Sequence, residues 1–296
     1  MVSGTFSAKP TYQQERGPEA LPFDQYAARL RDEFMPLLSR DPSESEVQEF
    51  LEHHPCLIPG AWTPGIKSGH YPLYRAVVSQ PRLPSLKSRQ PDFMWIAMHS
   101  GSWYPTLIEI ERPSKQIFTK SGVPCAEFTE ARNQLAQWRT WFNNPSNAQI
   151  FIEEYGVPQS IRQSRTMQLH TILVYGRREE FENNPELSKQ RSSLLSTPDE
   201  ELVSYDRLVV DHDLKDAITV RAEGSGQYRV VALPPVFCTS PQLADRLLHV
   251  RGFSAAIDAN LEITKARAEF LKRRISYWRE WAASPSSKIL SHGYRE

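Results

Sequence analysis

The sequence of 296 residues is 40% hydrophobic and 24% charged, so it is long and apolar enough to bury a substantial core. Its 35 basic and 35 acidic residues cancel, which excludes a strong overall attraction to nucleic acid and leaves such binding to local basic patches. It contains no signal peptide and no apolar run of membrane-spanning length. With three widely spaced cysteines, these features favour a cytoplasmic protein without a membrane partner.

The N-terminal part predicts a polar segment followed by two helices. Residues 1–22 are polar and contain Gly and Pro, so we expect them to be flexible. Apolar residues at helical spacing begin at Phe23, and Pro36 should bend or end that helix. A second helix is expected from near Ser43 to Pro55.

The middle of the sequence predicts a mixed sheet. Strands are expected from Tyr71, over residues 91–98 and over residues 103–110, the last two joined by a hairpin-like Ser-Gly-Ser turn. Residues 125–142 form a strongly amphipathic helix, and the apolar residues 167–176 form a strand that we expect to lie centrally. This order of elements indicates an α/β fold with a mixed central sheet flanked by helices.

We assign residues 23–210 to this α/β domain and residues 211–296 to a C-terminal α+β extension. A β-hairpin is expected over residues 216–233, and one long helix over residues 258–281. A weak heptad-like seam on that helix comprises Leu261, Thr264, Ala268, Leu271, Ile275, Trp278 and Ala282. Its other faces carry Lys265, Arg267, Lys272, Arg273, Arg274 and Arg279. The extension is therefore a candidate for oligomerisation or regulation.

Three carboxylates are the strongest chemical signal. Glu109 and Glu111 are two positions apart in a predicted strand, so they should share one face, and the hairpin-like turn should place Asp92 beside them. Such a cluster needs a cation or a proton to offset the repulsion between its charges. Oxygen ligands suit Mg²⁺ or Mn²⁺, and such an ion can polarise a phosphodiester and activate water. Alternatively, the two glutamates lie on a solvated face, paired with Arg112 or Lys115.

The pattern Pro-Asp, followed about seventeen positions later by Glu-x-Glu, resembles the motif of PD-(D/E)xK nucleases. The resemblance implies a restriction-endonuclease-like core in which Asp92 and Glu109 bind the metal ion. Glu111 stands where the family usually has lysine. It could hold a metal ion or act as general base, or Lys115 could supply the missing amine.

Two further residues fit this resemblance. Gln134, on the inward face of the predicted helix over residues 125–142, resembles the Gln of a Gln-x-x-x-Tyr element in RecB-like nucleases, with Trp138 in place of Tyr. Glu46 stands where family members often place a helix glutamate near the metal. It could equally form a capping box with Ser43. Glu44 and Glu49 are weaker alternatives for that role.

Six sequence blocks narrow the resemblance. In order they are SEVQEFLEHHPCLI, RQPDFMWI, LIEIERPSKQIF, ARNQLAQW, TILVYGRREEF and SYDRLV. Together they resemble the Shedu family of bacterial defence nucleases over roughly residues 40–210. The resemblance implies cleavage or nicking of phage or plasmid DNA, a divalent metal and a homo-oligomer. Family members usually carry a sensing segment N-terminal to the nuclease core, whereas the additional sequence here is C-terminal.

Basic residues near the carboxylates are candidates for contact with the DNA backbone. They are Arg82, Lys87 and Arg89, in the loop before Asp92, together with Arg112 and Lys115. No Gly-rich phosphate loop occurs, so no nucleotide cofactor is expected.

The leading hypothesis is a metal-dependent endodeoxyribonuclease that uses Asp92, Glu109 and Glu111, supported by Gln134 and Glu46. One alternative is a catalytically degenerate nuclease fold that binds DNA or a partner protein, because lysine is replaced at position 111. Another is an oligomeric assembly or regulatory module built on the C-terminal helix.

Overall fold

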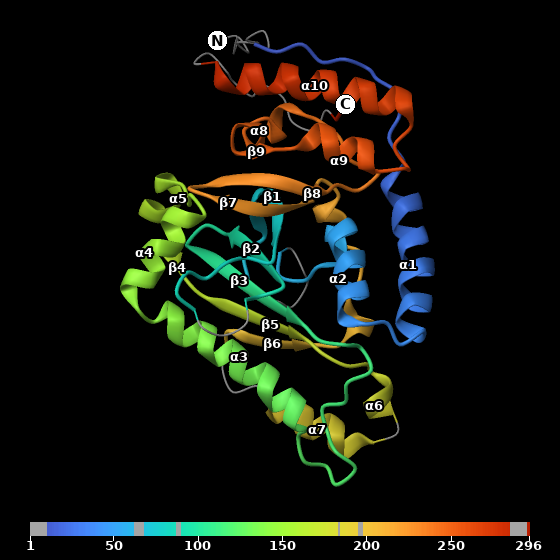
Figure 1. The fold of residues 1–296 in the computed structure, drawn as a ribbon, viewed down its shortest axis with the longest axis vertical. Coiled ribbons are helices and arrows are strands. Elements are labelled where there is room, and N and C mark those ends of the chain that lie inside the picture. Colours follow the sequence, from blue (N-terminus) through green and yellow to red (C-terminus); the bar gives the residue numbers. More distant parts are fainter. Residues whose placement is uncertain (1–10, 62–67, 87–89, 183, 195–197, 285–294) are drawn as a thin grey trace, which may run out of the picture.

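The computed structural model describes residues 11–61, 68–86, 90–182, 184–194, 198–284 and 295–296 (Figure 1). A nine-stranded sheet forms its centre, in the order β6-β5-β3-β2-β1-β7-β8-β9, with β4 also pairing with β3. The strands are β1 (Tyr71–Ser79), β2 (Phe93–Met98), β3 (Ser102–Ile110), β4 (Thr166–Met167), β5 (His170–Val174), β6 (Glu200–Val203), β7 (Ile218–Gly224), β8 (Gln227–Ala232) and β9 (Val250–Arg251).

Helices surround this sheet. They are α1 (Phe23–Ser39), α2 (Glu44–His53), α3 (Ala126–Phe142), α4 (Pro145–Glu154), α5 (Gln159–Ser164), α6 (Glu179–Glu182), α7 (Pro185–Ser193), α8 (Arg246–His249), α9 (Phe253–Ala259) and α10 (Lys265–Ala283). Short 3-10 helices occur at η1 (Pro55–Leu57), η2 (Tyr205–Arg207), η3 (His212–Leu214) and η4 (Pro241–Leu243). The part of the chain that is described has no helix both long and apolar enough to cross a membrane.

The sheet is mixed, as expected. Strands β1, β2 and β3 are antiparallel neighbours, whereas β3 with β5, β5 with β6 and β1 with β7 are parallel pairs. The expected strand over residues 167–176 is divided into β4 and β5. Strand β5 lies between β3 and β6, one position in from the edge of the sheet instead of at its centre.

Two apolar layers cover the faces of the sheet. One face packs against α1 and α2 through residues such as Leu30, Val47 and Leu51, and it includes Ile108 of β3. The opposite face packs against α3, and this layer includes Leu107 of β3. Figure 1 shows α1 and α2 on one side of the sheet and α3 and α4 on the other. Alternation along β3 therefore fixes which of its side chains face α3.

The expected N-terminal helices are confirmed as α1 and α2. Pro36 does not end α1, which continues to Ser39. The buried side chains of Phe34, Leu37 and Leu38 hold this last turn against the sheet layer, so packing overrides the proline.

The single helix expected over residues 258–281 is wrong, because α9 ends at Ala259 and α10 begins at Lys265. The side chain of Thr264 caps α10 by accepting the N–H of Arg267. Leu261, the first residue of the proposed seam, lies in the break and is 97% exposed. The later seam residues Leu271, Ile275 and Trp278 pack into the core of the same chain. Arg267 and Arg274, expected on polar faces, are buried.

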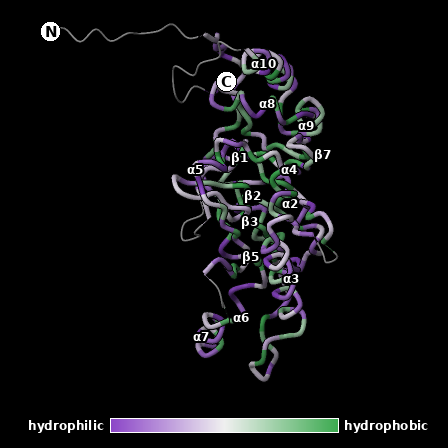
Figure 2. The backbone as a smooth tube through the Cα atoms, turned by 90° about the vertical axis from the view of Figure 1, so that its left-hand side faces the viewer, coloured by the Kyte–Doolittle hydropathy of each residue, from purple (hydrophilic) through white to green (hydrophobic). Residues whose placement is uncertain are grey.

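Residues far apart in the sequence meet along α10. Residues 11–22, the described part of the segment expected to be flexible, run alongside α10 with Tyr12 buried (Figure 1). The contacts of residues 11–22 with α10 are long-range, so they cannot be recognised from the sequence of the segment itself. The sheet also continues past residue 210, because β7 pairs with β1. Figure 2 shows α10 and the mostly hydrophilic α7 at opposite ends of the molecule.

Candidate acidic site

Asp92 lies immediately before β2, where the backbone holds its side chain against the end of β3. Its Oδ2 accepts the N–H of Ile110 at 2.8 Å. Its own N–H donates to the carbonyl of Ile108 at 3.0 Å, and its carbonyl accepts the N–H of Gln80 at 2.7 Å. The bond to Ile108 continues the β2–β3 ladder, the bond from Gln80 continues the β1–β2 ladder, and the bond from Ile110 fixes the direction of the carboxyl group.

Glu109 lies on the α3 side of β3 and is 3% exposed. Its Oε1 accepts a hydrogen bond from Nε2 of Gln134 at 2.8 Å, so the structure brings these two predicted residues together. Its Oε2 is buried and has no hydrogen-bond partner among the described residues. The carboxyl groups of Asp92 and Glu109 lie within hydrogen-bonding reach of each other, so a proton on Glu109 can be donated to Asp92.

Burial dominates the electrostatics of this pair. It raises the pKa of Asp92 to about 7, against the lowering effect of the Ile110 N–H, and Glu44 and Glu111 raise this pKa further. Burial also raises the pKa of Glu109 well above its ordinary value, with Asp92, Glu111 and Glu44 adding in the same direction. Two adjacent buried carboxyls therefore favour either a shared proton or a bound cation.

Glu111 lies close enough for its charge to raise the pKa of Asp92 and Glu109, but its carboxylate has a partner of its own. Strand β3 ends at Ile110, and the Glu111 carboxylate forms an ion pair with Lys115. Within the described ranges, no group of three or more His, Cys, Asp or Glu side chains is arranged to hold a metal ion. The expected three-acid convergence is thus a close pair, Asp92 and Glu109, with Glu111 nearby and already paired.

Glu44 and Glu46, in the first turn of α2, have different roles: Glu46 caps the helix, and Glu44 acts on the acidic pair. Glu46 forms the capping box: its Oε2 accepts the N–H of Ser43 at 2.8 Å, and its own N–H donates to Ser43 Oγ at 3.3 Å. These bonds to Ser43 lower the pKa of Glu46, and the residue is exposed. Glu44, two residues earlier, is the helix acid whose charge raises the pKa of both Asp92 and Glu109. Of these two glutamates, Glu44 is therefore the one whose charge acts on Asp92 and Glu109.

Tyr205 lies beside the acidic site, and no role was predicted for it from the sequence. It is completely buried, and its hydroxyl donates to the carbonyl of Glu111 at 2.6 Å. Burial raises its pKa well above the usual range, and the charges of Asp92 and Glu44 add to this. Its only signal in the sequence was its place within the block SYDRLV. The bond ties η2 to the end of β3 and so fixes the backbone from which Glu111 projects.

The basic candidates have different surroundings. Arg112 forms an ion pair with Asp41 at 2.7 Å, and both side chains are about half exposed. Lys115 pairs with Glu111, as described above. Arg82 is exposed, and its carbonyl accepts the hydroxyl of Tyr155 at 2.8 Å. Lys87 and Arg89 lie outside the described residues.

A solvent-open cleft of about 940 Å³ adjoins Lys115. Its charged lining residues include Asp41, Lys115, Lys120, Arg177 and Glu180. The cleft therefore borders the Glu111–Lys115 ion pair through Lys115, while Asp92 and Glu109 are not among its lining residues.

Fold and site together define a mixed α/β protein with a buried acidic pair at the paired ends of two antiparallel strands, supported by a glutamine from a covering helix. A family model described as the C-terminal part of the Shedu protein SduA matches residues 41–209. The match covers more than half of the chain, which therefore belongs to the Shedu family. No curated protein and no solved structure matches the chain.

Proposed function

We propose that this protein is a metal-dependent DNA endonuclease of the PD-(D/E)xK type, centred on Asp92 and Glu109. Membership of the Shedu family links the chain to antiphage defence and supports DNA cleavage or nicking as the activity. The observation that carries the proposal is the buried pair of carboxyls, in which Glu109 Oε2 lacks a hydrogen-bond donor among the described residues. A buried carboxyl oxygen without a donor is costly for a fold unless a shared proton or a bound cation uses it.

The donor set fits a hard divalent cation, because carboxylate oxygens are the ligands that Mg²⁺ and Mn²⁺ prefer. Asp92 and Glu109 would hold the ion, and Glu44 could supply a further oxygen from the start of α2. Bound there, the ion would polarise the scissile phosphate and lower the pKa of the attacking water.

Other residues hold this pair in place. Gln134 fixes one oxygen of Glu109, and the Ile110 N–H fixes one oxygen of Asp92, so both carboxylates keep their free oxygens in defined directions. Glu111 takes the role of general base in this proposal, and the ion pair with Lys115 holds its carboxylate in position. The ion pair thus replaces the single lysine of the family pattern.

A plasmid-nicking assay with Mg²⁺ or Mn²⁺ tests the proposal. Asp92→Asn and Glu109→Gln should each lower the rate by roughly 100-fold or more, because each removes a charged ligand. Glu44→Gln should lower it less, and the matched control Glu46→Gln should leave it unchanged because Glu46 caps the helix. Wild-type rates in the Asp92 and Glu109 variants, or no cleavage with either metal, would refute the proposal.

The roles of Glu111 and Lys115 need a separate comparison. If Glu111 is the base, Glu111→Gln should lower the nicking rate about 100-fold or more, while Lys115→Met should lower it less. The opposite result would assign the decisive role to Lys115.

The Glu111–Lys115 ion pair also favours a second candidate, a degenerate nuclease fold that binds DNA without cutting it. Calorimetric titration distinguishes the two functions. Mn²⁺ binding that disappears in Asp92→Asn supports the nuclease, whereas DNA binding without any Asp92-dependent Mn²⁺ binding supports the degenerate fold. The homo-oligomer stays a prediction, which mass measurement in solution would test.

A further inference from the structure

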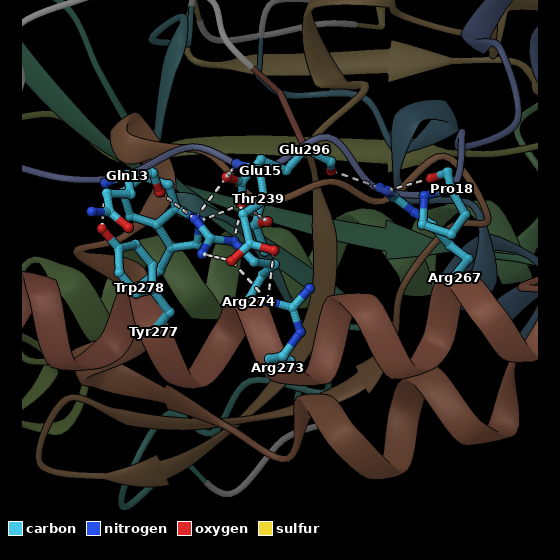
Figure 3. Close-up of polar contacts among 10 residues, drawn as sticks. All are labelled: Gln13, Glu15, Pro18, Thr239, Arg267, Arg273, Arg274, Tyr277, Trp278 and Glu296. Carbon is cyan, nitrogen blue, oxygen red and sulfur yellow. Dashed lines mark hydrogen bonds and ion pairs between the residues drawn. The ribbon is translucent and has the colours of Figure 1, made fainter.

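The side chain of Glu296 lies in a buried polar socket far from the acidic site (Figure 3). Its two oxygens accept hydrogen bonds from Arg274 Nε and Nη2, both at 2.7 Å. Trp278 Nε1 donates at 2.7 Å, Thr239 Oγ1 at 3.2 Å and the N–H of Glu15 at 2.8 Å. One carboxylate therefore receives five hydrogen bonds, and its exposed fraction is zero.

Backbone bonds hold the same residue. The N–H of Glu296 donates to the carbonyl of Thr239 at 2.8 Å, and its carbonyl accepts Nη2 of Arg267 at 2.6 Å. Arg295 donates to Asp216 Oδ1 at 2.5 Å. Residues 295–296 thus dock as a unit by specific polar contacts.

Three segments remote in sequence build this socket. Arg274 and Trp278 come from α10, and Thr239 precedes η4. Residues 13–18 close the third side: Arg274 Nη2 donates to the carbonyl of Gln13 at 2.6 Å, and Arg267 Nη1 to that of Pro18 at 2.8 Å. The occupant therefore lies where the N-terminal segment meets α10.

The walls of the socket exclude water and favour a negative occupant. Trp278 is completely buried and contacts the ring of Tyr12, with 5.5 Å between ring centroids. Arg267 and Arg274 are 4% and 1% exposed. Without Glu296, Arg274 would retain only the partly exposed Glu15 as an ion-pair partner among the described residues. A buried guanidinium in that position requires a carboxylate.

A pocket adjoins the socket next to residues 295–296, while the Glu296 side chain itself is fully buried. A pocket of about 470 Å³ is lined by Gly17, Pro18, Cys238, Arg267, Arg295 and Glu296. The docked residues 295–296 therefore border this pocket, whereas Arg274 and Trp278, which bind the carboxylate, do not line it.

We propose that this socket is a carboxylate receptor whose ligand is the Glu296 side chain of the same chain, bound as a separable peptide. Its occupancy fastens residues 11–18 to α10. When the glutamate leaves, the N-terminal segment loses the hydrogen bond from the Glu15 N–H to Glu296 and keeps only its direct bonds to α10. This inference does not depend on the proposed nuclease activity.

The test uses the full-length Glu296→Gln variant, in which the carboxylate is removed and the hydrogen-bonding shape is retained. A fluorescent peptide of residues 291–296, amidated at its end, carries Glu296 as its single acid. It should bind the variant about tenfold or more tightly than it binds the wild type, whose own tail fills the socket. A peptide with Gln at this position should bind about tenfold or more weakly.

Hydrogen exchange provides a second measurement that also guards against misfolding. Residues 11–18 should exchange faster in Glu296→Gln than in wild type, and added peptide should slow them again, while the amides of β2 and β3 stay protected. Glu280→Gln, at an exposed acid on α10, is the matched control and should behave as wild type. Peptide binding that is equal in wild type and variant, or independent of the peptide's glutamate, would overturn the proposal.

If the Glu296→Gln variant does not fold, the Glu296→Asp variant is used in its place. Aspartate keeps the negative charge, but its side chain is one methylene shorter, so the carboxylate no longer reaches its partners. Faster exchange of residues 11–18 in that variant, reversed by the peptide, would support the receptor. Unchanged exchange would contradict it.

Discussion

Asp92 makes the stability of the metal-free protein depend on pH. Burial raises its pKa from an ordinary value of 3.8 to about 7. Between these two values the folded chain holds a proton that the unfolded chain has lost. The stabilisation is therefore complete below about pH 4, declines as the pH rises towards 7, and is absent above it.

A shift of about three pKa units corresponds to roughly 4 kcal/mol in the free energy of unfolding. That is a large share of the roughly 5–15 kcal/mol by which domains are stable, so the effect should be measurable. Asp92→Asn removes the titration while keeping an oxygen that can accept the Ile110 N–H. The variant should therefore be more stable than wild type at about pH 8 and similar to it at about pH 4.

Urea unfolding in EDTA at constant ionic strength, from about pH 4 to about pH 8, measures this difference. Mn²⁺ should restore the wild type above pH 7 and have little effect on Asp92→Asn. Glu130→Gln, at an exposed acid on α3, should follow the wild-type curve. A difference between wild type and Asp92→Asn that stays constant across this pH range would refute the reasoning.

Three further substitutions test separate features. Gln134→Ala strips the donor from a buried carboxylate oxygen, so urea unfolding should show a loss of about 1–3 kcal/mol, and unchanged stability would contradict the bond. Ser43→Ala removes the α2 cap and should cost about 1 kcal/mol without altering the nicking rate; a rate loss would tie the cap to the site. Gly156→Ala would place a Cβ 2.4 Å from the Cα of Gly226 at a φ of +56°, so it should lower stability by roughly 1–3 kcal/mol. Gly101→Ala, whose Cβ meets nothing closer than 3.9 Å, is its control and should cost less.

Local periodicity predicted most of the elements around the acidic site. Alternation in β3 placed Glu109 opposite Ile108 and Ile110, and helical spacing in α3 placed Gln134 inward. Periodicity did not predict the partner of Glu111, which lies one residue beyond β3 although its charge still raises the pKa of Asp92 and Glu109. Beyond Ile110, the ion pair with Lys115 and the bond from Tyr205 decide where that residue lies.

The Glu296 socket could not be predicted in this way. Its walls come from residues 13–18, Thr239 and α10, and the occupant comes from residue 296, so no spacing within one segment reports the arrangement. The basic residues of α10 look alike in the sequence, yet Arg274 is buried and Arg273 is exposed. Arg274 differs from Arg273 because it bonds to Glu296 and Gln13, which are distant in the sequence.

Glu44 and Glu46 are an intermediate case. The sequence pattern of α2 distinguishes the two residues, although the prediction favoured Glu46 for the site. Glu44, Val47 and Leu51 are spaced by three and four residues, so they share one face of α2, and both apolar members are completely buried. Glu46 projects from the other side, where it is the third helical residue that a capping box requires after Ser43. Glu44 therefore lies at the start of the buried face of α2, and its charge raises the pKa of Asp92 and Glu109. Glu44 is thus the helix acid that acts on the buried pair, and Glu46 caps the helix.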